Sequence, residues 1–423
     1  MSRPALVEPR TAGSAAHRHA GGRRRRGRLI GAGVVVLVLA GGAAVAVPRW
    51  LRPHPVTVCG ADPLQSAAVA GLANFAGWLR RNDAAGYVGE IGWPSGPDGA
   101  RWAALADTWY RAADAIGLPV TAWAAARWPA SYPMAVYRHS SGSAPLDTAG
   151  PQATVVGAHP STRRYLRGVV VASGSFGAAD ASDTFSSTNR GRFGYDYGYE
   201  SAAGYAYLAA QGIRLVRLTL TWERIQPVPG GPLDPGELAR LRQALSQARQ
   251  AGLRVIIDLH GYGTFQLGTA GGPRPLVLGS TELPVGQLAD FWARLARATV
   301  DEPAVLGYDV LNEPVTLAVR GAVAARLWEQ ASQAAVDAIR AAGSTAFVAV
   351  TGYGTTSPAN WGQLHPRPWL TDPRHRVLYE AHAYFDADSS GHYDSTYADE
   401  VARADRTPVP RCHTLPDLTG RLR

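Results

Sequence analysis

The sequence lacks several features that would assign a protein to a class at once. Only two of its 423 residues are cysteines, so a network of disulfide bonds cannot hold the fold and a hydrophobic core must do so. No Gly-x-Gly-x-x-Gly or P-loop motif follows a candidate strand, so nothing indicates a nucleotide site. Since His-x-x-x-His and Cys-x-x-Cys spacings are also missing, we predict no metal ion and no cofactor. A hydrophobic content of 46%, with 12 Trp and 17 Tyr, indicates a globular chain.

The positive charge of the chain is confined to its N-terminal end. The formal net charge of +9 would, taken alone, suggest a nucleic-acid partner. However, the first 52 residues contain ten arginines against one acid, Glu8. All later residues together contain 32 arginines and 32 acids, so the main part of the protein is neutral. We therefore predict no nucleic-acid partner.

The N-terminal segment has the order of a membrane-targeting sequence. A basic stretch, 1–28, precedes an apolar segment, 29–48, whose uncharged part Leu29–Val47 has 19 residues. About 20 apolar residues are needed to cross the ~30 Å hydrocarbon core of a bilayer. Because the arginines precede this segment, we predict a cytoplasmic tail and a single-pass transmembrane helix with the rest of the chain outside the cell. The alternative is a secreted protein, since Ala44-Val45-Ala46 offers a signal-peptide cleavage site.

After a short predicted stalk, 49–65, the chain alternates between short apolar runs and segments of helical period. We predict one domain, 66–423. The eight candidate strands are Tyr87–Gly92, Val120–Trp123, Gly168–Ala172, Leu215–Thr219, Arg254–Leu259, Val305–Leu311, Ala346–Thr351 and Val377–His382. The candidate helices between them are Arg101–Ile116, Ser201–Gln211, Pro235–Ala251, Val285–Thr299 and Ala322–Ala342. Eight alternating units predict an α/β fold, a closed (β/α)₈ TIM barrel, with a doubly wound open sheet as the alternative.

Polar residues follow the ends of these strands, where a parallel barrel collects its functional side chains. They are Glu90, Trp123, Arg217, His260, Asn312, Glu313, His382 and Tyr384. Two carboxylates suit glycosidic bond cleavage, in which one protonates the leaving oxygen and the other attacks the sugar or activates water. A Trp offers a flat apolar face to a sugar ring, and an Arg beside a carboxylate keeps it ionised. Singly, a histidine such as His260 or His382 is more often a hydrogen-bonded core residue than a catalytic one, and Trp123 or Trp222 could equally be a core aromatic.

The motifs around these residues resemble those of glycoside hydrolase family 5, especially its endo-β-1,4-glucanases (cellulases). The matching stretches are Leu220–Pro227, Leu311-Asn312-Glu313-Pro314, Tyr379–Asp386, Gly89-Glu90-Ile91-Gly92 and Trp123-Ala124-Ala125. The resemblance implies a retaining mechanism with Glu313 as the general acid/base and Glu90 as the nucleophile. It further implies that Arg217, His260, Asn312, His382, Tyr384, Trp123 and Trp222 bind the polysaccharide or oligosaccharide substrate.

The order of the motifs departs from that family. Its nucleophile strand and its Trp strand come last, whereas in this sequence they come first, which implies a circular permutation that places strands seven and eight before strands one to six. Such a change is physically permissible where the termini lie close together. Cys59 and Cys412 would then flank the same break, and the permutation implies a Cys59–Cys412 disulfide contributing on the order of 4–5 kcal/mol.

Two further departures concern the outer sugar subsites. Gly168-Val169-Val170 and Ser175-Phe176-Gly177 replace the family's Gly-Val-Asn and Glu-Phe-Gly, and Gly261 stands where Asn is common. The substrate could therefore be mannan, a β-1,3-glucan or a glycolipid headgroup in place of β-1,4-glucan. A non-catalytic carbohydrate-binding barrel is the alternative from another functional class. We predict a monomer, with a strand-swapped dimer as the alternative.

Overall fold

The computed structural model describes residues 55–176 and 184–418, and the fold below refers to these residues. The predicted tail, 1–28, and the predicted membrane segment, 29–48, lie outside them. Among the residues that are described, no helix combines the length and the apolar composition needed to cross a membrane.

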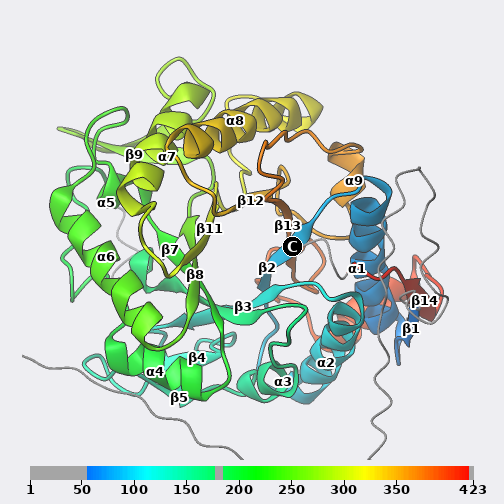
Figure 1. Cartoon of the computed structure of the whole chain (residues 1–423). Coiled ribbons are helices and arrows are strands. Elements are labelled where there is room, and N and C mark those ends of the chain that lie inside the picture. The colour runs from blue at the N-terminus through cyan, green and yellow to red at the C-terminus, as the bar shows by residue number, and fades with distance from the viewer. Residues whose placement is uncertain (1–54, 177–183, 419–423) are drawn as a thin grey trace, which may run out of the picture. The chain divides into compact units, whose positions relative to one another are not determined.

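Eight parallel strands form a closed barrel at the centre of the domain (Figure 1). In order around the barrel they are β2 (Gly86–Ile91), β3 (Val120–Ala126), β6 (Arg167–Val171), β7 (Leu215–Leu220), β8 (Arg254–Leu259), β11 (Val305–Asp309), β12 (Phe347–Thr351) and β13 (Val377–Ala383). Each strand pairs in parallel with the next, and β13 pairs with β2 to close the ring. All eight strands overlap the predicted ones. The closure confirms the barrel and excludes the open sheet.

Helices surround the barrel (Figure 1). They are α1 (Pro63–Arg81), α2 (Gly99–Ile116), α3 (Ala153–Ala158), α4 (Ala202–Ala210), α5 (Trp222–Ile225), α6 (Pro235–Gln250), α7 (Val285–Thr299), α8 (Gly321–Ala341), α9 (Trp361–Leu364) and α10 (Tyr397–Asp405). Helix α6 begins as its sequence predicts, because Asp234 accepts a hydrogen bond from the Glu237 N–H and Pro235 occupies the first turn. The five predicted helices correspond to α2, α4, α6, α7 and α8, and the glycines that follow three of them, Gly212, Gly252 and Gly343, have positive φ.

Shorter elements extend the sheet and the loops around the barrel. The 3₁₀ turn η2 (Ala172–Gly174) follows β6, and β4 (Tyr137–His139) and β5 (Leu146–Ala149) extend the sheet beside β3. A hairpin of β9 (Thr264–Thr269) and β10 (Gly272–Val277) follows β8.

Side chains inside the barrel form layers because alternate residues of a strand point to the same side. The layer near the N-terminal strand ends is apolar and consists of Tyr87, Leu215, Ile256, Ala349 and Leu378. Two residues further along three of these strands lie Arg217, Asp258 and Glu380, all fully buried. The barrel thus changes from an apolar floor to a charged layer, and the candidate site lies above that layer.

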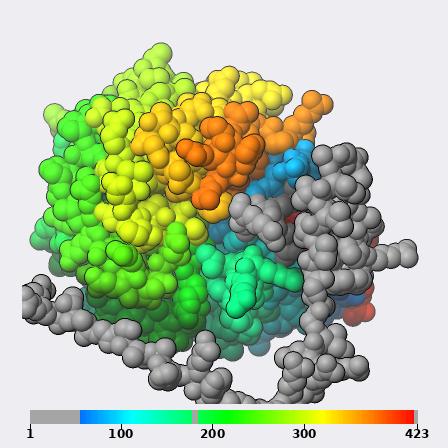
Figure 2. Space-filling view, viewed as in Figure 1, coloured from blue at the N-terminus to red at the C-terminus, as the bar shows by residue number. Residues whose placement is uncertain are grey.

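The two ends of the domain are joined to each other. Strand β1 (Val56–Cys59) pairs antiparallel with β14 (Cys412–Leu415), with Cys59 opposite Cys412. These cysteines form a disulfide with a Cα–Cα distance of 3.9 Å, which confirms the predicted pairing. In Figure 2, segments coloured light blue and orange, from the early and late parts of the domain, border each other on the visible face.

The predicted stalk, 49–65, differs from what is observed. Its described part contains β1 and the first turn of α1, so these residues belong to the barrel domain. The physical reason is that β1 has a pairing partner in β14, far away in the sequence, and that Asp62 caps α1 by accepting a hydrogen bond from the Gln65 N–H.

Candidate active site

A β-bulge turns Glu90 toward the barrel axis. Tyr87 points into the barrel, so strict alternation along β2 would point Gly89 inward and Glu90 outward. The register between β13 and β2 shifts between Ala381 and His382, so that His382 pairs with Glu90. The extra residue in β2 re-aims the following side chain, which is a common use of bulges near functional sites. Glu90 therefore faces the other polar residues at the C-terminal strand ends.

Both carboxylate oxygens of Glu90 accept hydrogen bonds. Arg217 on β7 donates from Nη1 to Oε1 at 2.8 Å, and the Tyr384 hydroxyl donates to Oε2 at 2.6 Å. Burial acts to raise the pKa of Glu90, which is 3% exposed, but His382, Arg217, His260 and Tyr384 together outweigh it and lower the pKa below its ordinary value. Glu90 is thus held ionised at neutral pH.

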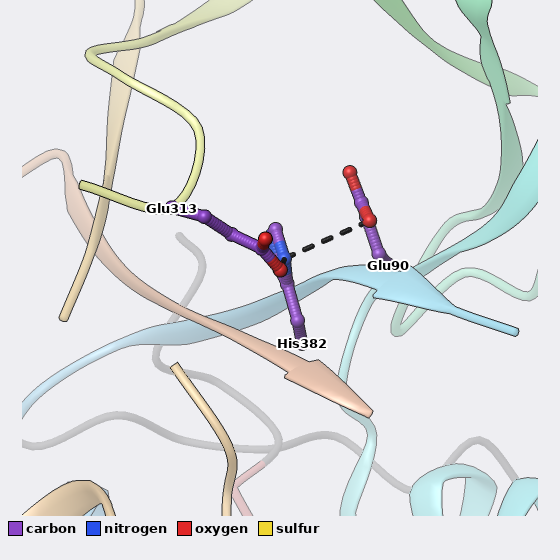
Figure 3. A group of neighbouring side chains, drawn as sticks. All are labelled: Glu90, Glu313 and His382. Atoms are coloured by element: carbon purple, nitrogen blue, oxygen red, sulfur yellow. Dashed lines mark hydrogen bonds and ion pairs between the residues drawn. The ribbon is translucent and has the colours of Figure 1, made fainter. Parts of the chain in front are cut away.

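Glu313 lies across the site from Glu90, with His382 between them (Figure 3). It follows β11 in a left-handed conformation, with φ of 38°, and its side chain remains 15% exposed. The Nδ1 atom of His382 lies 2.8 Å from Glu313 Oε1 and 3.7 Å from Glu90 Oε2. One oxygen of each glutamate and one nitrogen of His382 all lie within 4.8 Å of one another.

His382 is a cation in this environment. Burial alone would lower its pKa, yet Glu90, Glu313 and Glu380 raise that pKa well above its ordinary value. Although the two glutamates and His382 are close enough to share a metal ion, a metal ligand must be deprotonated, and both Glu90 oxygens already have partners. We therefore assign no cation to this group.

Arg217 connects the site to the charged layer beneath it. Its guanidinium group donates to Asn312 Oδ1 at 3.0 Å and to Asp309 Oδ2 at 2.7 Å, and it lies 3.1 Å from Asp258 Oδ2. Burial raises the pKa of Asp309 well above its ordinary value, and Glu380 and Asp258 raise it further against the opposing effect of Arg217. The net effect favours the protonated form of Asp309. These three buried acids were not among the predicted site residues.

His260 and Trp123 form one wall of the site. Their rings stack at 5.6 Å with an interplanar angle of 18°, and His260 Nδ1 lies 2.8 Å from Asp258 Oδ2. The other ring nitrogen, Nε2, is buried and has no hydrogen-bond partner among the described residues. It is therefore available to a ligand hydroxyl group.

Further aromatic rings enlarge this wall, and sequence reasoning missed their place in the site. Tyr132 accepts a hydrogen bond from Trp123 Nε1 at 2.7 Å and stacks on Trp128 at 4.4 Å. Phe176 contacts the rings of Trp123 and His260 at 5.8 and 5.2 Å. Most of these rings lie on loops, which have no periodicity from which their orientation could be predicted.

Eight of the nine predicted site residues come together, and Trp222 is the exception. It lies in α5, is 4% exposed, and contacts Phe265 of β9 and Phe291 of α7 at 5.8 and 5.5 Å. Its Nε1 atom donates to Gln226 Oε1 at 2.9 Å. The sequence predicts that Trp222 contacts the sugar, but in the structure it packs between the strand ends and the helix layer. The position of a residue next to a strand end does not determine the direction of its side chain.

The fold and these carboxylates define the class of the protein. Residues 178–409 match the family model described as cellulase (glycosyl hydrolase family 5), which is more than half of the chain. The chain belongs to glycosyl hydrolase family 5.

Individual relatives in this family are named as endoglucanases. The manganese-dependent endoglucanase Eg5A of Phanerodontia chrysosporium is 28% identical over 208 residues, which are 47% of this chain and 49% of the relative. Endo-β-1,4-glucanase B of Emericella nidulans is 26% identical over 233 residues, which are 53% and 64% of the two chains. The solved structure of Pseudomonas stutzeri endoglucanase Cel5A with cellobiose is 33% identical, covers 54% of this chain and 62% of the other, and has a TM-score of 0.44. The chain spans about half the length of the first curated relatives it matches.

Proposed function

We propose that this protein is a retaining glycoside hydrolase that cleaves β-1,4-glucan chains. The observation that carries the proposal is the approach of the Glu90 and Glu313 carboxylates, whose nearest oxygens are within 4.8 Å. Retaining enzymes place the two carboxyl groups about 5–5.5 Å apart, whereas inverting enzymes need about 6.5–9.5 Å to admit a water molecule. The separation therefore favours direct attack by a carboxylate.

In the first step, Glu90 is the nucleophile. It is held ionised by Arg217 and Tyr384, and one of its oxygens attacks the anomeric carbon. Glu313 donates its proton to the glycosidic oxygen, so the bond between the anomeric carbon and that oxygen breaks as the bond to Glu90 forms. The products are a covalent glycosyl-enzyme and a shortened glucan with a new hydroxyl group.

In the second step, Glu313 is the general base. Its carboxylate removes a proton from water, the water oxygen attacks the anomeric carbon, and the bond to Glu90 breaks. Two inversions give overall retention of configuration. Both glutamates return to their starting protonation states.

The aromatic wall supports a sugar substrate. Trp123 is 8% exposed and stacks on His260, whose Nε2 has no partner among the described residues, so a sugar ring stacked on the indole would bring a hydroxyl group within reach of that nitrogen. The relatives named as endo-β-1,4-glucanases favour glucose units joined by β-1,4 bonds. Asn312, fixed by Arg217, is the candidate partner for the sugar 2-hydroxyl.

The test is hydrolysis by the purified full chain. Carboxymethylcellulose and cello-oligosaccharides are supplied beside mannan and a β-1,3-glucan, and new reducing ends are measured. Glu90→Gln and Glu313→Gln keep side-chain size but remove the carboxylates, so both should abolish release. Glu237→Gln is the matched control, since Glu237 on α6 is also buried but accepts hydrogen bonds from Tyr197 and Tyr199, neither of which is a proposed site residue.

Two further readouts separate the alternatives. NMR of the first product should show the β-anomer, and a 2-deoxy-2-fluoro cellobioside should add its mass to the peptide that contains Glu90. Release that survives either glutamine variant would contradict the assignment. Binding of glucan without turnover by the wild type would favour the non-catalytic barrel, and preferential release from mannan or β-1,3-glucan would change the substrate.

We also propose the circular permutation, export and a monomeric state. The permutation is supported by the pairing of β2 with β13, which puts the Glu90 strand next after the His382 strand, and by a family match that begins at residue 178, after β2 and β3. Export is supported by the sequence of residues 1–48, in which a basic stretch precedes an apolar segment, and by the Cys59–Cys412 disulfide.

Cell fractionation with protease protection tests export, and light scattering of the purified protein tests the monomeric state. A chain that starts at Arg163 and links residue 418 to residue 55 should fold and remain active.

A further inference from the structure

Glu380 is a fully buried carboxylate to which the proposed mechanism gives no role. It lies on β13 two residues before His382, so both side chains point into the barrel. Its Oε1 atom is 3.3 Å from His382 Nε2 and 3.4 Å from Arg217 Nε. Burying a carboxylate away from solvent destabilises the folded protein unless charged or hydrogen-bonding partners compensate for the lost hydration.

The neighbouring strand leaves room for this carboxylate. A Cβ atom at Gly89 would lie 1.5 Å from Glu380 Oε1, so no other residue fits at this position without moving Glu380. Gly89 sits at the bulge that turns Glu90 inward. The residue before the nucleophile therefore accommodates Glu380.

Glu380 and Glu313 hold the two nitrogens of one imidazole. His382 Nδ1 is 2.8 Å from Glu313 Oε1, and Nε2 is 3.3 Å from Glu380 Oε1. An imidazole with carboxylates at both nitrogens keeps both protons, since each N–H is a donor. The ring then cannot turn without losing both contacts.

The position of this cation matters because negative charge moves during the proposed reaction. In the free enzyme Glu90 is ionised, and in the glycosyl-enzyme Glu313 is ionised while Glu90 is part of a neutral ester. His382 Nδ1 faces both carboxylates, at 3.7 and 2.8 Å. A single fixed positive charge can thus stabilise both states without reorganisation.

We propose that Glu380 is a positioning residue that keeps the His382 imidazole protonated and directs its Nδ1–H at the two catalytic carboxylates. This inference rests on the proposed function for its consequence in catalysis, but the link between Glu380 and His382 can be measured without any substrate.

The charged groups that surround His382 determine the sign of the expected effect. Glu90 on β2, Glu313 after β11 and Glu380 on β13 itself all favour the protonated ring, and burial opposes it. Arg217 on β7 is a further cation that contacts two of these carboxylates, Glu90 and Glu380. Glu380→Gln removes a negative charge that favours the protonated ring whichever catalytic glutamate is ionised, so the pKa of His382 should fall and the ring should lose its proton at a lower pH than in the wild type.

The first measurement is an NMR titration of the imidazole in the full chain, with the His382 signals assigned from His382→Asn. The wild-type ring should stay doubly protonated through neutral pH, and the ring in Glu380→Gln should titrate at a lower pH. Glu380→Asp keeps the charge but retracts it by one methylene, so it should fall between the two. Glu237→Gln, which neutralises a buried glutamate elsewhere, should leave the His382 titration unchanged.

The second measurement is the pH profile of glucan hydrolysis. Glu380→Gln should lower kcat by about 10- to 100-fold and change KM little. This range is typical of residues that orient a site residue without contacting the substrate themselves. Its alkaline limb should move to lower pH by the same amount as the NMR titration, and Glu380→Asp should restore part of the rate. Glu237→Gln should keep the wild-type profile even if it lowers the unfolding temperature.

The outcomes are distinct. A His382 titration that is unchanged in Glu380→Gln overturns the proposal, as does equal inactivity of the Gln and Asp variants with wild-type titration. If Glu380→Gln does not fold, an unchanged titration in Glu380→Asp overturns it. A shifted titration in a protein whose wild type cleaves no glycan supports the link to His382 and refutes the proposed function alone.

Discussion

The two parts of the barrel build the site in different ways. Arg217 and His382 lie on β7 and β13, and His260 directly follows β8. The pairings of β6 with β7, β7 with β8 and β12 with β13 are regular, and the register shift between β8 and β11 lies at the N-terminal end of β11, between Val305 and Gly307. Strands β2 and β3 carry Glu90 and Trp123, and every pairing of these two strands with a barrel neighbour contains a register shift. The proposed nucleophile and the sugar platform therefore lie on the two strands that are shifted against both of their barrel neighbours, whereas β7, which carries Arg217, pairs regularly on both sides.

This difference determines how sensitive the side-chain directions in each part are to a single substitution. In a regular strand the direction of a side chain follows from alternation, so it is set by the whole strand. At a bulge the direction depends on one or two local residues, such as Gly89. The predictions below test the irregular part against the rest of the domain.

The largest effect is expected at Glu90. Glu90→Gln should lower kcat by on the order of 10⁴-fold, because the nucleophile and its charge are both lost. Glu90→Asp retracts the carboxylate by one methylene and should still cost at least about 100-fold, since a displacement of about 1 Å is enough for such a loss. Initial rates on cello-oligosaccharides measure both. An aspartate variant with the wild-type rate would show that catalysis does not depend on the precise position of the carboxylate at residue 90.

The next largest effect is expected at Gly89. Gly89→Ala forces Glu380 or β2 to move, because the new methyl group would overlap Glu380 Oε1. We expect a loss of about 1–3 kcal/mol in the free energy of unfolding and a fall in kcat beyond what the unfolded fraction explains. Gly157→Ala in α3, where nothing lies within 4 Å of the added Cβ, is the control and should be neutral or slightly stabilising. Urea unfolding and kcat at a temperature where both variants are folded would show whether the two differ.

A smaller effect on activity separates the two tryptophans. Trp123→Ala should lower kcat/KM on glucan by about tenfold, because a stacking face for the sugar is lost. Both a higher KM and a lower kcat should contribute to this loss. Trp222→Ala should instead lower the free energy of unfolding by about 3–5 kcal/mol through a cavity against Phe265 and Phe291, with KM nearly unchanged. A Trp222 variant with normal stability and a raised KM would reverse the assignment made from the structure.

The smallest effect on activity is expected at the disulfide. Cys59→Ser with Cys412→Ser should leave kcat unchanged at low temperature, because the bridge joins β1 to β14 outside the site. Stability should fall by up to about 6 kcal/mol by the loop-entropy model for a separation of 353 residues, and by less if the β1–β14 pairing persists. Thermal unfolding of the oxidised, reduced and double-serine proteins measures this. Equal unfolding temperatures in all three would show that pairing alone holds the ends together.

The sequence predicted the barrel well because its signals are local. Each strand is an apolar run between helices whose ends carry caps or glycine, as at Gly252 and Gly343. Alternation within β8 and β13 also contained a signal that was not used: Asp258 and Glu380 lie two residues before His260 and His382, so they had to face the same interior. A charged residue inside an apolar strand, two positions from a predicted site residue, is a candidate for the layer beneath the site.

Other features could not be predicted because they depend on contacts between distant segments. The bulge in β2 exists in the register with β13, so its effect on Glu90 cannot be derived from β2 alone. Strand β1 looks like a short Pro-containing linker until its partner β14 is known. Trp123 and Trp222 both belong to motifs that resemble those of the family, yet Trp123 on β3 faces the site and Trp222 in α5 faces α7.

The joined ends of the domain also determine how it would carry a mechanical load. Cys59 and Cys412 are covalently linked near the two ends of the described chain, and β1 pairs with β14 over the same residues. A force applied between the chain ends would pass from one sulfur to the other and would not reach the 352 residues between them. The barrel would therefore stay folded under tension while the disulfide is intact. After reduction of the disulfide, the same force would pull β1 and β14 apart and act on the barrel.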